Sequence, residues 1–175
     1  MDPTKLAVGS GIAVVAVGGG LGAKFAVDAR TPSSLKNNGE YSGTGDKSKY
    51  GYKNADKLMS TLAVRNNFFW EERVLDLAKQ EPINLSTGGF FGTSFNEKIT
   101  AYKTEKGNST SNETTIKEKL DEAVKDLKEK CKSKYDDVST SMTSGDDAKW
   151  REFWELCSVS KQVPSNLEDT FSVKA

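Results

Sequence analysis

The sequence contains no histidine, and only two cysteines occur among its 175 residues. The absence of histidine excludes Ser-His-Asp and Cys-His catalytic groups and every metal site that uses an imidazole ligand. Two cysteines that are not spaced as C-x-x-C do not predict a zinc site either. Net charge is also missing, because 25 basic side chains balance 25 acidic ones, so nothing attracts the chain as a whole to nucleic acid. We therefore expect no cofactor, no metal ion and no nucleic-acid partner.

Charged residues are absent from an eighteen-residue run near the start of the chain, Leu6–Ala23. A helix of this length is just long enough to cross a hydrocarbon core of about 30 Å. Lys5 and Lys24 flank the run, and their long side chains can extend toward the lipid headgroups on either side. We predict a single transmembrane helix that lies in a bilayer, within an anchor of residues 1–27. Its main apolar residues are Leu6, Ala7, Val8, Ile12, Val14, Val15, Val17 and Leu21.

Six glycines lower the propensity of this run for helix formation and for membrane insertion. Gly18 and Gly22 form a small-x-x-x-small pair, which would allow two copies of the chain to associate through close helix contact. An uncleaved signal sequence is the main alternative to an anchor. A nucleotide-binding strand is a weaker one, because residues 18–23 match G-x-G-x-x-A but the polar segment that follows lacks the required strand and helix patterns.

The rest of the chain divides into three parts by composition. Residues 28–52 are rich in Ser, Gly, Asn and Lys, which is typical of a flexible linker. Residues 53–160 carry helical patterns and predict a small helical domain, so the expected fold class is mainly α. Residues 161–175 predict a loosely held tail that follows the last helix.

The clearest helix of this domain is expected over residues 115–135. Thr115 and Glu118 form a capping box there, and apolar residues recur at steps of three and four along one face. Further helices are expected over residues 67–81 and 144–157, where apolar residues again share one face.

Two segments of the domain give weaker patterns. Asn54 is expected to cap a helix that carries Leu58 and Leu62 on one face. Gly88–Gly92 predicts an irregular Gly/Phe segment. The apolar residues that follow it fit either a short helix or an irregular strand; they are Phe95, Ile99 and Tyr102.

The two cysteines lie on the apolar faces of their predicted helices, near the C-terminal end of each. A bond between Cys131 and Cys157 would close a loop of about 26 residues and would stabilise the fold by roughly 3–4 kcal/mol. Such a bond needs a crossed or offset packing of the two helices, since the C-terminal ends of an antiparallel hairpin lie apart. Two buried thiols that act as small hydrophobic groups are an equal alternative.

Aromatic residues at helical spacing are expected to form the core of the domain, and an exposed recognition surface is the alternative. The candidate core aromatics are Phe69, Trp70, Trp150, Phe153 and Trp154. Paired carboxylates, which can carry out glycoside or metal-assisted hydrolysis, are expected to be solvated surface charges here. These pairs are Glu71/Glu72, Asp136/Asp137 and Asp146/Asp147.

Two stretches resemble the paralogous families of short, membrane-anchored proteins of haemotropic mycoplasmas, for which no activity is assigned. The first is the Gly/Ala-rich start, from Lys5 to Ala23. The second combines Leu127-Lys-Glu-Lys-Cys131 with Trp150-x-x-x-Trp154-x-x-Cys157, although Lys130 and Leu156 stand where these families often have Trp. The resemblance implies a single-pass protein that is exposed on the outer face of the membrane.

The basic residues that flank the apolar run favour the opposite orientation. Lys24, Arg30 and Lys36 outnumber Lys5 and the free amine, which by the positive-inside rule would keep the body in the cytoplasm. We give the resemblance more weight than this small bias. We therefore expect an interaction protein or antigenically variable protein that contacts host or neighbouring surface proteins. A membrane-tethered hydrolase that uses carboxylates or a metal ion, and a scaffold at the cytoplasmic face, are the alternatives.

Overall fold

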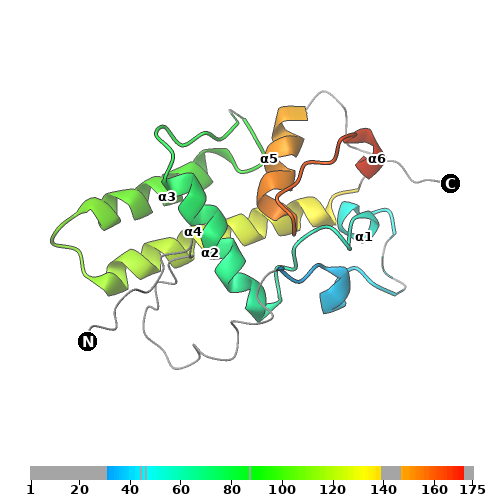
Figure 1. The fold of residues 1–175 in the computed structure, drawn as a ribbon, viewed down its shortest axis with the longest axis horizontal. Helices are drawn as coiled ribbons and strands as arrows, with labels where there is room; N and C mark the ends of the chain where they lie inside the picture. Colours follow the sequence, from blue (N-terminus) through cyan, green and yellow to red (C-terminus); the bar gives the residue numbers. More distant parts are fainter. Residues whose placement is uncertain (1–30, 44, 46, 87, 139–146, 172–175) are drawn as a thin grey trace, which may run out of the picture. The chain divides into compact units, whose positions relative to one another are not determined.

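The computed structural model describes residues 31–43, 45, 47–86, 88–138 and 147–171. Over these residues the chain is mainly helical and has no β strand, which confirms the predicted class for this part of the protein (Figure 1). The helices are α1 (Tyr50–Lys53), α2 (Asn67–Ala78), α3 (Gly92–Gly107), α4 (Glu113–Asp136), α5 (Asp147–Cys157) and α6 (Glu168–Phe171), with 3-10 turns η1 (Lys36–Asn38) and η2 (Val64–Asn66).

The predicted anchor of residues 1–27, with Gly18 and Gly22, lies outside the described residues. Within the described ranges, no helix combines the length and the apolar character that a bilayer crossing requires. The predicted transmembrane helix therefore stays a prediction.

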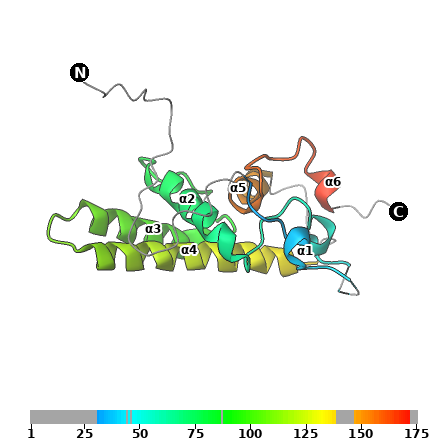
Figure 2. The same cartoon turned by 60° about the horizontal axis from the view of Figure 1, so that its bottom comes forward.

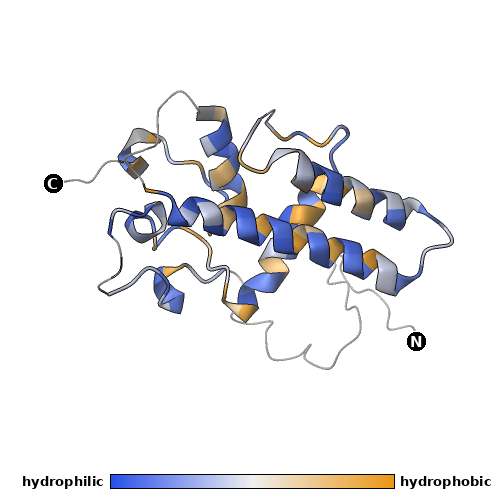
Figure 3. Ribbon diagram, turned by 180° about the vertical axis from the view of Figure 1, so that it is seen from behind, coloured by the Kyte–Doolittle hydropathy of each residue, from blue (hydrophilic) through white to orange (hydrophobic). Residues whose placement is uncertain are grey.

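α4 is the longest helix and packs against α1, α2, α3 and α5. It begins two residues earlier than its expected capping box, because the Asn112 side chain accepts a hydrogen bond from the Thr115 N–H at 2.9 Å. In Figure 3 the ribbon of α4 alternates between hydrophilic and hydrophobic segments, as expected for a helix with one buried face. The buried residues of α4 are Ala123, Val124, Leu127, Cys131 and Tyr135.

α3 and α4 run side by side as a hairpin, and α2 lies across them (Figures 1 and 2). The segment of uncertain pattern after Gly92 is thus a helix and not an irregular strand. The side chains that it buries follow each other at steps of four and three, which is helical spacing. They are Phe95, Ile99 and Tyr102.

The prediction of a flexible linker over residues 28–52 is wrong for the part of it that the structure describes. Leu35 and Tyr50 are completely buried in the core. The Leu35 N–H donates to the carbonyl oxygen of Leu58 at 2.9 Å, next to an antiparallel bridge between Ser34 and Met59. Composition suggested a linker because single apolar residues among many polar ones show no periodicity, yet Leu35 and Tyr50 each fill a site in the core.

The helix expected from Asn54 is absent, and α1 ends where that helix was to begin. The Asn54 amide donates to the carbonyl oxygens of Tyr50 and Thr170, at 3.1 and 3.2 Å. Leu58 instead forms an antiparallel bridge with Ser158, so this segment is extended. A partner about one hundred residues away thus overrides the local helical pattern.

The tail expected over residues 161–175 also differs from the prediction where it is described. Leu167 and Thr170 are buried, and residues 168–171 form α6. The Tyr50 hydroxyl donates to the Thr170 hydroxyl oxygen at 2.9 Å, and the rings of Tyr50 and Phe171 lie 5.8 Å apart. These contacts hold the described part of the tail against α1.

Candidate functional site

The aromatic residues of α5 form the centre of the core. Trp150, Phe153 and Trp154 are all buried, and each has its ring within 6.4 Å of the Tyr50 ring. The Trp154 indole N–H donates to the Tyr50 hydroxyl oxygen at 3.0 Å, and burial raises the Tyr50 pKa above its ordinary value. Of the other two candidates, Trp70 is buried and Phe69 is half-buried against the same core. These aromatics are therefore packing residues and do not form an exposed recognition surface.

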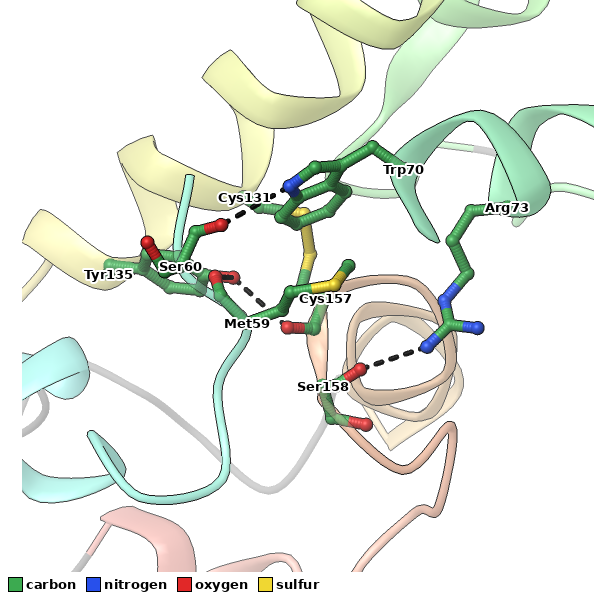
Figure 4. Close-up of a disulfide and its surroundings, with 8 residues drawn as sticks. All are labelled: Met59, Ser60, Trp70, Arg73, Cys131, Tyr135, Cys157 and Ser158. Carbon is green, nitrogen blue, oxygen red and sulfur yellow. Dashed lines mark hydrogen bonds between the residues drawn. A yellow bond between two sulfur atoms is a disulfide. The ribbon is translucent and has the colours of Figure 1, made fainter. Parts of the chain in front are cut away.

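The structure joins Cys131 of α4 to Cys157 of α5 in a disulfide (Figure 4). The two Cα atoms lie 5.7 Å apart, and both residues are completely buried. α5 crosses α4 in this arrangement and does not run along it as an antiparallel partner (Figures 1 and 2). The crossed packing removes the geometric obstacle that a hairpin would have imposed on this bond.

Hydrogen bonds tie four segments of the chain together around the disulfide (Figure 4). The Tyr135 hydroxyl lies 3.0 Å from the carbonyl oxygens of both Met59 and Cys157, and the Met59 N–H donates to the Cys157 oxygen at 2.8 Å. The Trp70 indole N–H donates to the Ser60 carbonyl oxygen at 3.2 Å. A fully buried disulfide is closed to an attacking thiolate, so this centre is suited to cross-linking and not to redox exchange.

Arg73 of α2 is an unexpected member of this centre. It is only 4% exposed, and its Nη2 donates to the carbonyl oxygen of Ser158 at 3.0 Å. Ser158 directly follows α5, so the guanidinium lies at the negative end of the α5 dipole. Burial lowers the Arg73 pKa, although nearby Glu72 and Asp76 oppose this shift. The spacing of α2 gives no hint that a charged residue would be buried here.

The carboxylate pair of α2 does not converge. Lys161 lies 3.5 Å from the Glu72 carboxylate. Glu71 lines a different surface. Burial raises the pKa of Glu71, and the charge of Lys117 only partly offsets this. The two carboxylates thus face different surroundings, although they are adjacent in sequence.

The second carboxylate pair lies at the end of α4 and is bound by cations. Asp136 contacts Lys132 at 2.6 Å and accepts a hydrogen bond from the Tyr41 hydroxyl at 2.7 Å. Burial opposes ionisation of Asp136, but the hydrogen bonds from Lys132 and Tyr41 outweigh it and lower the pKa. Asp137 pairs with Lys134. Asp146 lies outside the described residues.

Glu152 is a buried carboxylate that the sequence analysis missed. It is 9% exposed, and its Oε1 accepts a hydrogen bond from the Ser86 N–H at 3.1 Å. Burial raises the pKa of Glu152, and the hydrogen bond from Ser86 only partly offsets this. No group of three or more Cys, Asp or Glu residues in the described ranges is placed to hold a metal ion. Glu152 is thus an isolated buried acid.

A polar groove of about 520 Å³ runs between α2 and α4. Most of its lysines are paired along α4, such as Lys117 with Asp121 at 2.9 Å. The Lys128 ammonium instead donates to the amide oxygen of Asn67 at 3.2 Å, and burial lowers its pKa. The groove residues are Thr61, Asn67, Glu71, Lys117, Asp121, Val124, Lys125, Lys128, Glu129 and Lys132.

Three apolar side chains between residues 62 and 68 are exposed, and we call them the apolar patch: Leu62, Val64 and Phe68. They are 67%, 81% and 50% exposed. They belong to the loop that leads through η2 into the first turn of α2, where Figure 3 shows hydrophobic ribbon. Two groove residues are neighbours of the patch in the sequence: Thr61 precedes Leu62, and Asn67 precedes Phe68.

The first described residues of the body are fixed to this same loop. The Arg65 guanidinium donates to the Thr31 carbonyl oxygen at 3.0 Å. The Ser33 N–H donates to the Asn66 side-chain oxygen at 2.7 Å, and the Asn66 amide donates back to the Ser33 carbonyl oxygen at 2.8 Å. The chain therefore enters the body at the apolar patch.

The sequence analysis missed this surface because it assigned Leu62 to a helix face and gave Val64 and Phe68 no role. The one available signal was that apolar residues flank a loop rich in Asn and Arg.

The sequence matches no protein-family model, and neither a curated protein nor a solved structure shows significant similarity to it.

Proposed function

We propose that this is a single-pass membrane protein that displays its helical body outside the membrane and acts by binding. The uncharged run Leu6–Ala23 supports the anchor, because it has the length that a bilayer crossing needs. Its partners would be host or neighbouring surface proteins, as the resemblance to the haemotropic mycoplasma families implies. Variation among paralogues would then serve an interaction role or an antigenic role.

The disulfide supports the external placement of the body. Disulfides persist in oxidising surroundings and are rare where cellular thiols keep cysteines reduced. The bond between Cys131 and Cys157 leaves the described part of the chain with no free cysteine. The disulfide is stronger support than the small excess of basic residues after the apolar run, which favours a cytoplasmic body.

One observation carries the choice of binding over hydrolysis. Three of the four large apolar side chains that are exposed in the described ranges lie between residues 62 and 68, whereas the described carboxylate pairs are separated or bound by lysines. A carboxylate-dependent hydrolase needs two acids that converge on a substrate in a concave site. An exposed apolar patch is instead typical of an interaction surface.

The test combines membrane extraction with protease treatment of intact cells that produce the full chain. We expect the protein to stay in the membrane pellet after alkaline carbonate washing, and protease to remove the body without cell lysis. A protein that is released by carbonate, or a body that is cut only after lysis, would overturn the anchor or the external placement respectively.

A matched pair of variants controls this test. Val14→Arg together with Val15→Arg places two charges in the run, at a cost to insertion of about 5–7 kcal/mol, and should release the protein into the supernatant. Ser109→Arg together with Thr110→Arg adds the same charge to the exposed loop between α3 and α4 and should leave the protein in the pellet.

A further inference from the structure

The length of chain between the proposed span and the body is short. A helix that starts at Leu6 and crosses a core of about 30 Å needs about twenty residues and ends near Phe25. Six residue steps then separate Phe25 from Thr31, the first described residue. Even a fully extended chain covers only about 21 Å in six steps. A flexible linker through residue 52 would have allowed about 98 Å by the same arithmetic, over the 28 steps from Phe25 to Lys53.

The point of entry fixes which face of the body this tether holds near the bilayer. Thr31 and Ser33 are hydrogen-bonded to Arg65 and Asn66, which lie between the patch residues Val64 and Phe68. The chain is fixed to the body again at Leu35, which is completely buried. The body therefore cannot rotate freely about this point of entry. The apolar patch is therefore the part of the described surface with the shortest chain connection to the membrane.

We propose that the apolar patch lies on the bilayer surface, with Leu62, Val64 and Phe68 inserted among the lipid headgroups. This inference rests on the proposed membrane anchor and names what the patch contacts. Leucine and phenylalanine side chains enter the boundary between headgroups and acyl chains favourably. Three such residues bind a membrane only weakly from solution, but the tether makes their contact with lipid intramolecular and so raises their effective concentration.

One cation beside the patch fits the same partner. The Lys128 ammonium contacts Asn67, the residue before Phe68, and donates there to an amide oxygen. Cations next to an apolar patch complement the phosphate groups of lipids. Seated in this way, the body holds the start of α2 at the membrane. The end of α2 has no exposed large apolar side chain to draw it to lipid, because Phe68 is the exposed one on this helix.

The experiment compares two label sites at opposite ends of α2 in the full chain. Val64→Cys places a single reactive thiol in the patch, and Lys79→Cys places one at the exposed C-terminal end of α2, about 16 Å from Phe68 along the helix axis. Each variant carries an environment-sensitive nitrobenzoxadiazole label and is reconstituted into phosphatidylcholine/phosphatidylglycerol liposomes. Because Cys131 and Cys157 are buried and bonded, only the new thiol reacts.

We expect the label at position 64 to emit at shorter wavelength and to be quenched by lipids with a nitroxide on the acyl chain. The label at position 79 should be quenched only by iodide in the water. A second labelled variant, Leu62→Cys, should behave like Val64→Cys, and circular dichroism should show the wild-type helix content in all three.

Three outcomes overturn the inference, and they differ from failure of the anchor. Equal quenching by iodide at positions 64 and 79 would mean that the patch faces water. Protection of position 64 from both iodide and nitroxide lipids would mean that a protein surface, such as a second copy of this chain, covers the patch. Chain that does not float with the liposomes at all would refute the membrane anchor itself, and this inference with it.

Discussion

Reduction of the bond between Cys131 and Cys157 is expected to lower the free energy of unfolding by about 3.5 kcal/mol. The bond joins residues that are 26 positions apart, and loop-closure entropy for about 26 residues gives this value. The compact unit Thr31–Ala175 has 145 residues, so its entropy of unfolding is about 0.3 kcal/mol/K. The melting temperature should therefore fall by about 11 °C.

The assay is a thermal melt of the full chain in detergent, followed by near-ultraviolet circular dichroism. It compares the oxidised protein with protein that was unfolded in denaturant with a thiol reductant and then refolded in its presence, because the folded body shields the bond. Reduction keeps both sulfur atoms in the core, so it isolates the cross-link from packing. The double variant Cys131→Ala with Cys157→Ala also removes the sulfurs, which are completely buried, and should lose a further 1–2 kcal/mol or so. The double variant should not respond to reductant.

Two results would refute this reasoning. If the reduced wild type melts at the temperature of the oxidised protein, while a thiol assay counts two free cysteines, the cross-link does not stabilise the fold. If unfolded protein that was purified without reductant already shows two free thiols, the bond does not form. The second result would also remove the disulfide as support for an external body.

Three further predictions concern the same core. Gly51→Ala should cost about 1–3 kcal/mol in chemical denaturation, because its new Cβ would lie 2.9 Å from the Cβ of Tyr135, whereas Gly107→Ala meets no atom within 4 Å and should be neutral. Tyr135→Phe should cost about 1–2 kcal/mol in the same assay, since the Met59 carbonyl oxygen loses its hydroxyl donor; an unchanged midpoint would contradict that bond. Burial raises the pKa of Glu152, so its contribution to stability is complete below the ordinary glutamate pKa and is lost as the pH rises through the raised value. Urea titrations between pH 4 and pH 7 should therefore show wild type losing stability relative to Glu152→Gln as the pH rises, and parallel curves would rule this out.

The helices that the sequence predicted correctly are those with a long apolar stripe. α4 buries Leu127, Cys131 and Tyr135 at steps of four, and the apolar face predicted for α5 is buried from Trp150 to Cys157. This spacing is a local property of the chain. The burial of Trp70, Trp150 and Trp154 could be predicted in the same way, because large aromatic residues at helical spacing rarely stay in water.

The helix expected from Asn54, and the cap expected at Thr115, failed for a different reason. At Asn54 the local preference was weaker than a long-range contact, whereas at Thr115 another local cap three residues earlier took its place. Asn54 binds the carbonyl oxygen of Thr170 from the far end of the chain, and Asn112 caps α4 one turn before the expected box. The bonded state of the cysteines was open for the same reason, since only the crossing of α5 over α4 brings Cys157 to Cys131.

The sequence by itself determined the uncharged run, the absence of histidine and the mainly helical character of the body, because each depends only on residue type and short-range spacing. Only the tertiary structure decided that Leu35 and Tyr50 are buried in the core, that the cysteines meet, and that Leu62, Val64 and Phe68 stay exposed. Burial and pairing at these places depend on residues 20 to 120 positions away, and no local pattern encodes a partner at that distance.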